Sequence, residues 1–86
     1  MIYEVKNLAT ARQFLSLANK KVTLINPLGS TRYYGMRVID YIFKTLQQEF
    51  PSKITDVIVN AHDDYSAFVT ARQLGYQQIQ YTNVAA

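Results

Sequence analysis

The sequence predicts a single α/β domain in which strands and helices alternate. Two patterns point to this class: three segments repeat apolar residues at three-to-four spacing, and short apolar or β-branched runs separate them. Such alternation favours right-handed crossovers and a mostly parallel sheet. We therefore expect one three-layer domain over residues 1–86, ordered β-α-β-α-β-α-β, with about four mostly parallel strands and helices on both faces of the sheet.

The first third of the chain predicts a strand, a helix and a second strand. Residues 2–5 form the first expected strand. Asn7 then predicts a helix start, because an asparagine side chain accepts hydrogen bonds from the free amides of a first turn. Residues 22–25 are predicted as a buried strand, which ends at Asn26 and Pro27. The apolar face of the helix consists of residues at helical spacing: Leu8, Ala11, Leu15 and Ala18.

A long helix is expected over about residues 32–50, with Ser30 or Thr31 as its cap and Pro51 at its end. One apolar face of this helix covers the sheet. A second apolar stripe has no obvious place in the core of one chain: Tyr34, Val38 and Tyr41. Tyrosine is favoured at interfaces because its ring buries a large area while its hydroxyl stays hydrated.

This stripe predicts self-association through the helix, most simply as a homodimer. The charged fraction of 17% lies below the usual value of about 25%, which leaves less polar surface to cover the outside. The predicted partner is thus a second copy or another protein.

The last third of the chain predicts a strand, a helix and a final strand. The strand over residues 54–61 contains a continuous β-branched run at 57–59, which is typical of strands covered on both faces of a parallel sheet. Asp63 or Asp64 is expected to cap a helix over residues 65–74, and Gly75 suits its end. Residues 78–81 form the last expected strand, and residues 83–86 a tail.

Composition excludes several classes of protein. The chain has no cysteine, so disulfide scaffolds and thiolate zinc sites are excluded. The net charge is +3, but only Lys20 and Lys21 are adjacent, so we do not expect the basic stripe of a nucleic-acid-binding surface. The sequence has neither the pattern of a signal peptide nor an apolar stretch of about 20 residues for a membrane span, so we expect a cytoplasmic protein.

Two polar segments follow the second and third expected strands, at residues 26–32 and 60–64. Open parallel sheets bind ligands beyond the carboxyl ends of their strands, so both segments are candidate sites. Glycine, hydroxyls, a guanidinium and a helix start suit an anion such as phosphate. The candidate anion-binding or ligand-binding residues are Gly29, Ser30, Thr31, Arg32, His62 and Asp63.

The alternative interpretation of both segments is structural. Serine, threonine and aspartate commonly cap helices, and His62 then is a solvated loop residue. His62, Asp63 and Asp64 are consecutive and point in different directions, so we expect no metal site, and no motif implies a cofactor. No nucleophile elbow is present, so we assign no catalytic residue. The favoured function is a non-enzymatic interaction module, and the alternative is an anion-binding or small-ligand domain, with or without enzymatic activity.

Two segments resemble short bacterial α/β proteins of uncharacterised function. In those proteins a Pro-x-Gly turn follows one strand, a Tyr-x-Gly opens a long helix and an Asp-Asp pair follows the next strand. The matching residues here are 27–29, 33–35 and 63–64, and the similarity covers residues 22–82. Those relatives often carry Asp and Cys where this chain has Asn60 and Ala61, so the resemblance implies no activity.

The order of elements alone is also similar to STAS-like and receiver-like domains. A receiver needs a phosphoacceptor aspartate at the end of its third strand, where this chain has Asn60. The resemblance to STAS-like domains is therefore one of layout.

Overall fold

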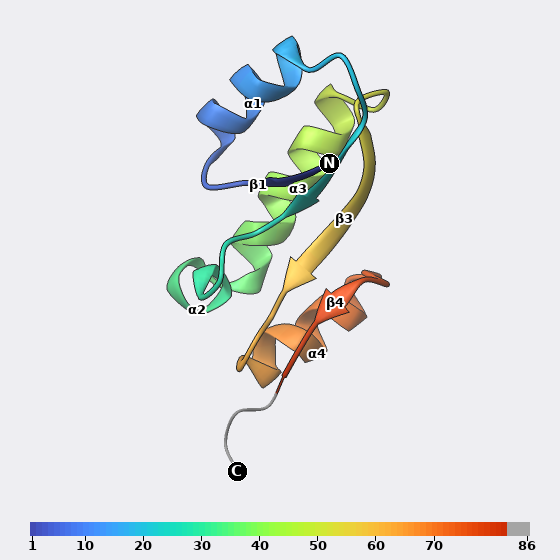
Figure 1. Ribbon diagram of the computed structural model, residues 1–86. Helices are drawn as coiled ribbons and strands as arrows, with labels where there is room; N and C mark the ends of the chain where they lie inside the picture. Colours follow the sequence, from blue (N-terminus) through green and yellow to red (C-terminus); the bar gives the residue numbers. More distant parts are fainter. Residues whose placement is uncertain (83–86) are drawn as a thin grey trace.

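The computed structural model describes residues 1–82 and contains the predicted alternation of strands and helices (Figure 1). Its four strands form one parallel sheet in the order β1-β2-β3-β4, so the fold class and the order of elements are confirmed. The expected tail at 83–86 lies outside the described residues. The elements are β1 (Ile2–Glu4), α1 (Leu8–Leu17), β2 (Val22–Ile25), α2 (Ser30–Tyr34), α3 (Met36–Glu49), β3 (Ile54–Asn60), α4 (Tyr65–Gln73) and β4 (Ile79–Gln80).

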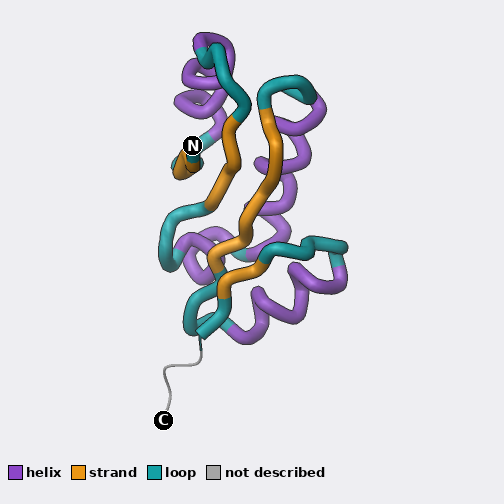
Figure 2. Tube along the Cα trace, turned by 45° about the vertical axis from the view of Figure 1, so that its right-hand side comes forward, coloured by secondary structure: helices purple, strands orange, loops and turns teal. Residues whose placement is uncertain are grey.

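The helices α1, α3 and α4 lie together on one face of the sheet, with the strands in front of them in Figure 2. Helix α3 contacts α1 on one side and α4 on the other. The strand order explains this arrangement, because right-handed crossovers that always step to the next strand in one direction place every helix on the same side. The expected second layer of helices is therefore wrong for the described residues, and the fold has two layers.

Side chains of the two central strands alternate between the helical layer and the uncovered face. Tyr3, Leu24 and Val57 are paired in register and pack in the core beneath the helices. The adjacent rows point to the other face, which we call the open face. It consists of the row Ile2, Thr23 and Asp56 and the row Glu4, Ile25 and Ile58. None of these six residues belongs to the hydrophobic core.

The expected helix over residues 32–50 is two helices, α2 and α3, separated at Gly35. Gly35 has φ 89° and ψ 148°, a backbone conformation that residues other than glycine rarely adopt. The prediction that Ser30 or Thr31 caps the helix is wrong, because both residues lie inside α2. The residue at the cap position of α2 is Gly29, which has φ 82° and no side chain to accept a hydrogen bond. Glycine thus sets both the start of α2 and the corner between the two helices.

The caps predicted for the other two helices are present. The Asn7 Oδ1 accepts a hydrogen bond of 2.9 Å from the amide of Thr10. Asp64 is the acidic residue that caps α4, and its Oδ1 accepts from the amide of Ala67 at 3.2 Å. Both helices therefore begin where the sequence placed them.

The core lies between the helical layer and the covered face of the sheet. Its centre is α3, whose residues Ile39, Phe43 and Leu46 recur at helical spacing and are at most 4% exposed. Among residues 1–82 no helix is long and apolar enough to cross a membrane. In the same residues no three His, Asp or Glu side chains converge as metal ligands would.

Candidate functional site

The carboxyl ends of β2 and β3 are joined by Asn26, which is 2% exposed. Its Oδ1 accepts from the amide of Asn60 at 2.7 Å, and its Nδ2 donates to the carbonyl of Asn60 at 3.0 Å. The same Nδ2 donates to Ser30 Oγ at 2.8 Å. The segments 26–32 and 60–64 therefore lie side by side, as expected for neighbouring strands.

A second set of contacts links α2 to the segment before α4. Thr31 Oγ1 donates to Asp64 Oδ2 at 2.8 Å, and Ser30 Oγ donates to the carbonyl of Pro27 at 2.7 Å. Ser30 and Thr31 are only 6% and 4% exposed. Their hydroxyls hold the loops together, which is a structural role other than the helix capping that the sequence predicted. Arg32 donates to the carbonyl of Asp63.

The six candidate ligand-binding residues do not line one cavity. Thr31 and Arg32 face a groove between the α2–α3 corner and α4. Gly29 and Ser30 border a separate hollow, and His62 lines another hollow next to β4. The two loops meet, but their side chains point to different surfaces.

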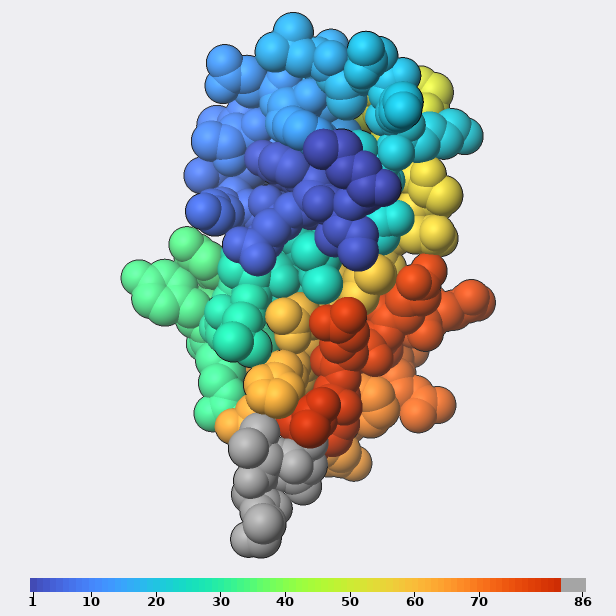
Figure 3. Space-filling view, viewed as in Figure 1, coloured from blue at the N-terminus to red at the C-terminus, as the bar shows by residue number. Residues whose placement is uncertain are grey.

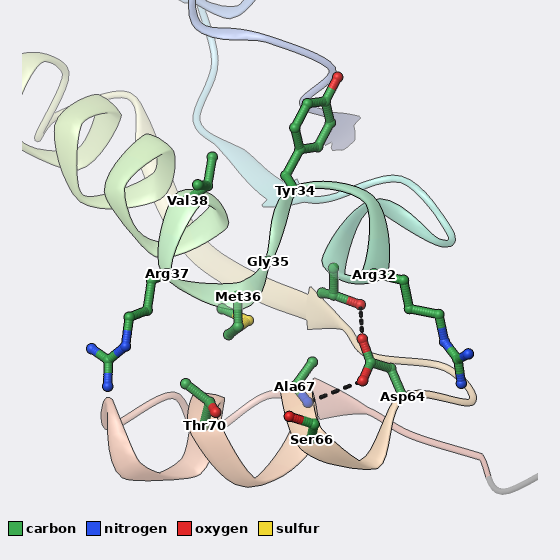
Figure 4. Close-up of a pocket in the computed structure, with 11 residues that line it drawn as sticks. Arg32, Tyr34, Gly35, Met36, Arg37, Val38, Asp64, Ser66, Ala67 and Thr70 are labelled. Carbon is green, nitrogen blue, oxygen red and sulfur yellow. Dashed lines mark hydrogen bonds between the residues drawn. The ribbon is translucent and has the colours of Figure 1, made fainter.

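The groove between the α2–α3 corner and α4, hereafter the α2–α4 groove, has a volume of about 590 Å³. Figure 4 shows Arg32 and Arg37 at its two ends, with Ser66 and Thr70 of α4 opposite them. Helix α3 begins in the wall of this groove, directly after Gly35. No side chain caps this helix, so no cap accepts hydrogen bonds from its first backbone amides. The sequence did not single out Arg37 or Thr70, and only the helix break at Gly35 brings Arg37 to this groove.

The charges of the groove are nearly balanced. The Arg32 guanidinium lies 3.8 Å from Asp63 Oδ2, and the Asp64 carboxylate accepts from Thr31 and from the first turn of α4. Arg37 makes no ion pair with any described residue. The attraction for an anion is therefore concentrated at the end formed by Arg37 and the start of α3. No histidine lines the groove, so its hydroxyls lack a neighbouring imidazole base.

The two walls of the groove are tied together by a polar contact beyond α4. The Tyr76 hydroxyl donates to Asp40 Oδ1 of α3 at 2.6 Å, and Lys44 Nζ donates to the same oxygen at 2.8 Å. Burial and the adjacent Asp40 carboxylate raise the pKa of Tyr76 well above its usual range. Burial alone would raise the pKa of Asp40, but the hydrogen bonds from Lys44 and Tyr76 outweigh it and hold that pKa below its usual value.

The stripe predicted as an interface lies on α2 and α3, and two of its residues, Tyr34 and Val38, also line the α2–α4 groove. Tyr34, Val38 and Tyr41, hereafter the α3 stripe, are 52%, 45% and 63% exposed. Tyr34 and Val38 point to the side of the α2–α3 corner opposite Arg32 and Asp64 (Figure 4). These side chains are thus accessible in the single chain.

Comparison with curated proteins finds a bacterial relative. The uncharacterized protein RP547 of Rickettsia prowazekii (strain Madrid E) is 46% identical over 85 residues, which cover 99% of this chain and 80% of the relative. No family model and no solved structure matches. The predicted resemblance to uncharacterised bacterial proteins is confirmed, and the chain belongs to the same family as the rickettsial protein RP547.

Proposed function

We propose that this protein is a non-enzymatic interaction module that self-associates. The observation that supports the proposal is the uncovered face of a parallel sheet. Parallel sheets occur almost only with both faces covered, and their strands then have apolar side chains on both sides. Here Ile25 and Ile58 lie on the face that no helix of the described chain covers. A partner molecule would supply the missing layer.

Two apolar surfaces are available for this association. One is the open face, and the other is the α3 stripe that the sequence singled out. The stripe is narrow, because the exposed cationic residues Arg37 and Lys44 lie on the same helix. The open face is broader, since it extends across three strands.

The first test is the mass of the protein in solution. Sedimentation velocity from about 1 to about 300 µM is expected to show a concentration-dependent species of twice the 9.9 kDa chain mass, because small interfaces give micromolar dissociation constants. A single monomeric species across the whole range would contradict the proposal.

A second candidate function is the binding of a small anion in the α2–α4 groove. The supporting observation is that Arg37, free of ion pairs with described residues, lies beside the uncapped start of α3. Arg32 lines the other end of this groove, whereas His62 lines a separate hollow next to β4.

Titration with inorganic phosphate, followed by amide resonances, tests this second function. Shifts are expected at residues 36–38, with millimolar affinity, and Arg37→Gln should weaken binding about 5- to 10-fold, as expected for loss of one charge-assisted contact. The matched control is Lys20→Gln, which removes an exposed charge remote from the groove and should leave the affinity unchanged. Shifts spread evenly over all basic surfaces would rule out a site in the groove.

A further inference from the structure

We infer that the open face is where a second copy of this chain binds, with the two sheets stacked face to face. The inference rests on the proposed self-association and names the surface that carries it. Figure 3 shows atoms of β2 and β3 at the surface between the N-terminal segment and β4, with no helix in front of them.

The sequence of the central strands fits a sheet that is covered twice. Val22, Leu24 and Val59 fill the covered face and are at most 1% exposed. On a solvated face we would expect polar residues at positions 25 and 58, but both are isoleucine. Ile25 and Ile58 are direct neighbours in register. Ile2 continues this apolar area to the edge strand and is 62% exposed. A one-sided sheet has polar residues at such positions, so these isoleucines indicate burial in an assembly.

The acidic residues of the open face are placed so that two copies can stack. Glu4 lies on β1 in the row of Ile25 and Ile58, whereas Asp56 lies on β3 in the row of Ile2. A two-fold axis along the strands at β2 places Glu4 over the partner's Ile58 and Asp56 over the partner's Ile2. A two-fold axis across the strands places Glu4 over Ile2 and Asp56 over Ile58. In neither arrangement does a carboxylate face a carboxylate, because each carboxylate faces an isoleucine of the second copy.

The same residues argue against other classes of partner. The two rows of the open face contain two carboxylates and no basic side chain. Nucleic acid and anionic lipid surfaces would be repelled by such a face. A second copy presents the same residues without bringing two carboxylates face to face, which is the self-complementarity that a two-fold contact requires.

The size of the face sets the expected strength of the dimer. Strands are spaced about 4.8 Å apart and rise about 3.3 Å per residue, so the two rows, which span three residues on three strands, measure about 150 Å² in projection. A standard interface buries about 800 Å² on each partner. The two rows are therefore only the centre of the contact, and we expect a weak dimer with a dissociation constant in the upper micromolar range and a separation between the sheets of about 10 Å.

A new carboxylate on the open face is the first part of the test. Ile58→Glu is expected to raise the dissociation constant at least about 100-fold, because in either two-fold arrangement the new carboxylate faces Glu4 or Asp56 of the second copy. Leu17→Glu is the matched control, since Leu17 is an exposed apolar residue (79%) of α1 and its replacement should leave the dimer intact. Tyr41→Glu, which alters the α3 stripe, should also leave it intact. Ile58→Thr keeps a β-branched residue and should weaken the dimer less, with circular dichroism confirming that each variant is folded.

Cross-linking locates the contact directly, because the chain contains no cysteine. Thr23→Cys places one thiol at the centre of the open face, and oxidation or a short bis-maleimide should capture a covalent dimer; Leu17→Cys should not. A dimer broken by Tyr41→Glu but not by Ile58→Glu would overturn this inference and leave the proposed self-association in place. A wild-type chain that is monomeric throughout would overturn both.

Discussion

Replacing Phe43 with alanine is expected to leave the protein largely unfolded. Phe43 is 1% exposed at the centre of α3, and its ring meets that of Tyr76 edge-on with centroids 6.3 Å apart. Removing a buried phenylalanine costs about 3–5 kcal/mol through lost transfer energy and the cavity left behind. At about 0.05–0.15 kcal/mol per residue, a chain of 86 residues has a free energy of unfolding of only about 4–13 kcal/mol. The loss is thus a large part of the total.

Urea unfolding followed by circular dichroism measures this effect. Phe43→Leu keeps most of the volume and should cost about 1 kcal/mol. Val38→Ala, on the exposed side of the same helix, controls for changes in helix propensity and should cost less than about 0.5 kcal/mol. If Phe43→Ala lowered the free energy of unfolding by no more than the Phe43→Leu variant, the assignment of Phe43 to the centre of the core would be wrong. The unfolding should be measured at one fixed protein concentration, since the proposed dimerisation would add to the apparent stability.

Replacing Asn26 with alanine is expected to lower the free energy of unfolding by about 2–4 kcal/mol. The side chain satisfies both the amide and the carbonyl of Asn60 and also bonds Ser30 Oγ. Alanine leaves these groups unpaired in a site that is 2% exposed, and an unsatisfied buried polar group costs more than the bond itself contributes. The change removes the link between the ends of β2 and β3.

The position of the damage distinguishes this effect from general destabilisation. Hydrogen exchange should accelerate first at the amide of Asn60 and in α2, before the centre of α3. Asn19→Ala, at an exposed position between α1 and β2, is the matched control and should change stability by less than about 0.5 kcal/mol. Equal stability of the Asn26→Ala variant and the wild type would show that water replaces the side chain without cost.

Features that depend on neighbouring residues were predictable from the sequence. Asn7 and Asp64 cap their helices because a short polar side chain needs only the next turn as partner. The parallel class followed from alternation of helical and strand patterns, and the adjacency of the two polar loops followed once β2 and β3 were neighbours. Contacts of this local kind do not depend on how the rest of the chain is arranged.

Features that depend on distant segments were not predictable. The number of helical layers follows from strand order, which no local pattern encodes, and so the second layer was expected wrongly. The break at Gly35 was not predictable, because glycine is tolerated inside a helix as well as at the end of one. Asn26 was identified only as the end of a strand, since its main partner is 34 residues away. The α2–α4 groove needs both the break and the position of α4.

The edges of the sheet limit how far these molecules can assemble. The outer strands β1 and β4 have three and two residues, and β1 carries Glu4, so neither presents a long row of free backbone groups to another chain. Growth by adding strands sideways, the route to fibres, is therefore blocked at both ends. The proposed association through the open face under two-fold symmetry would occupy that face in one step, so assembly would stop at a closed pair instead of continuing as a polymer.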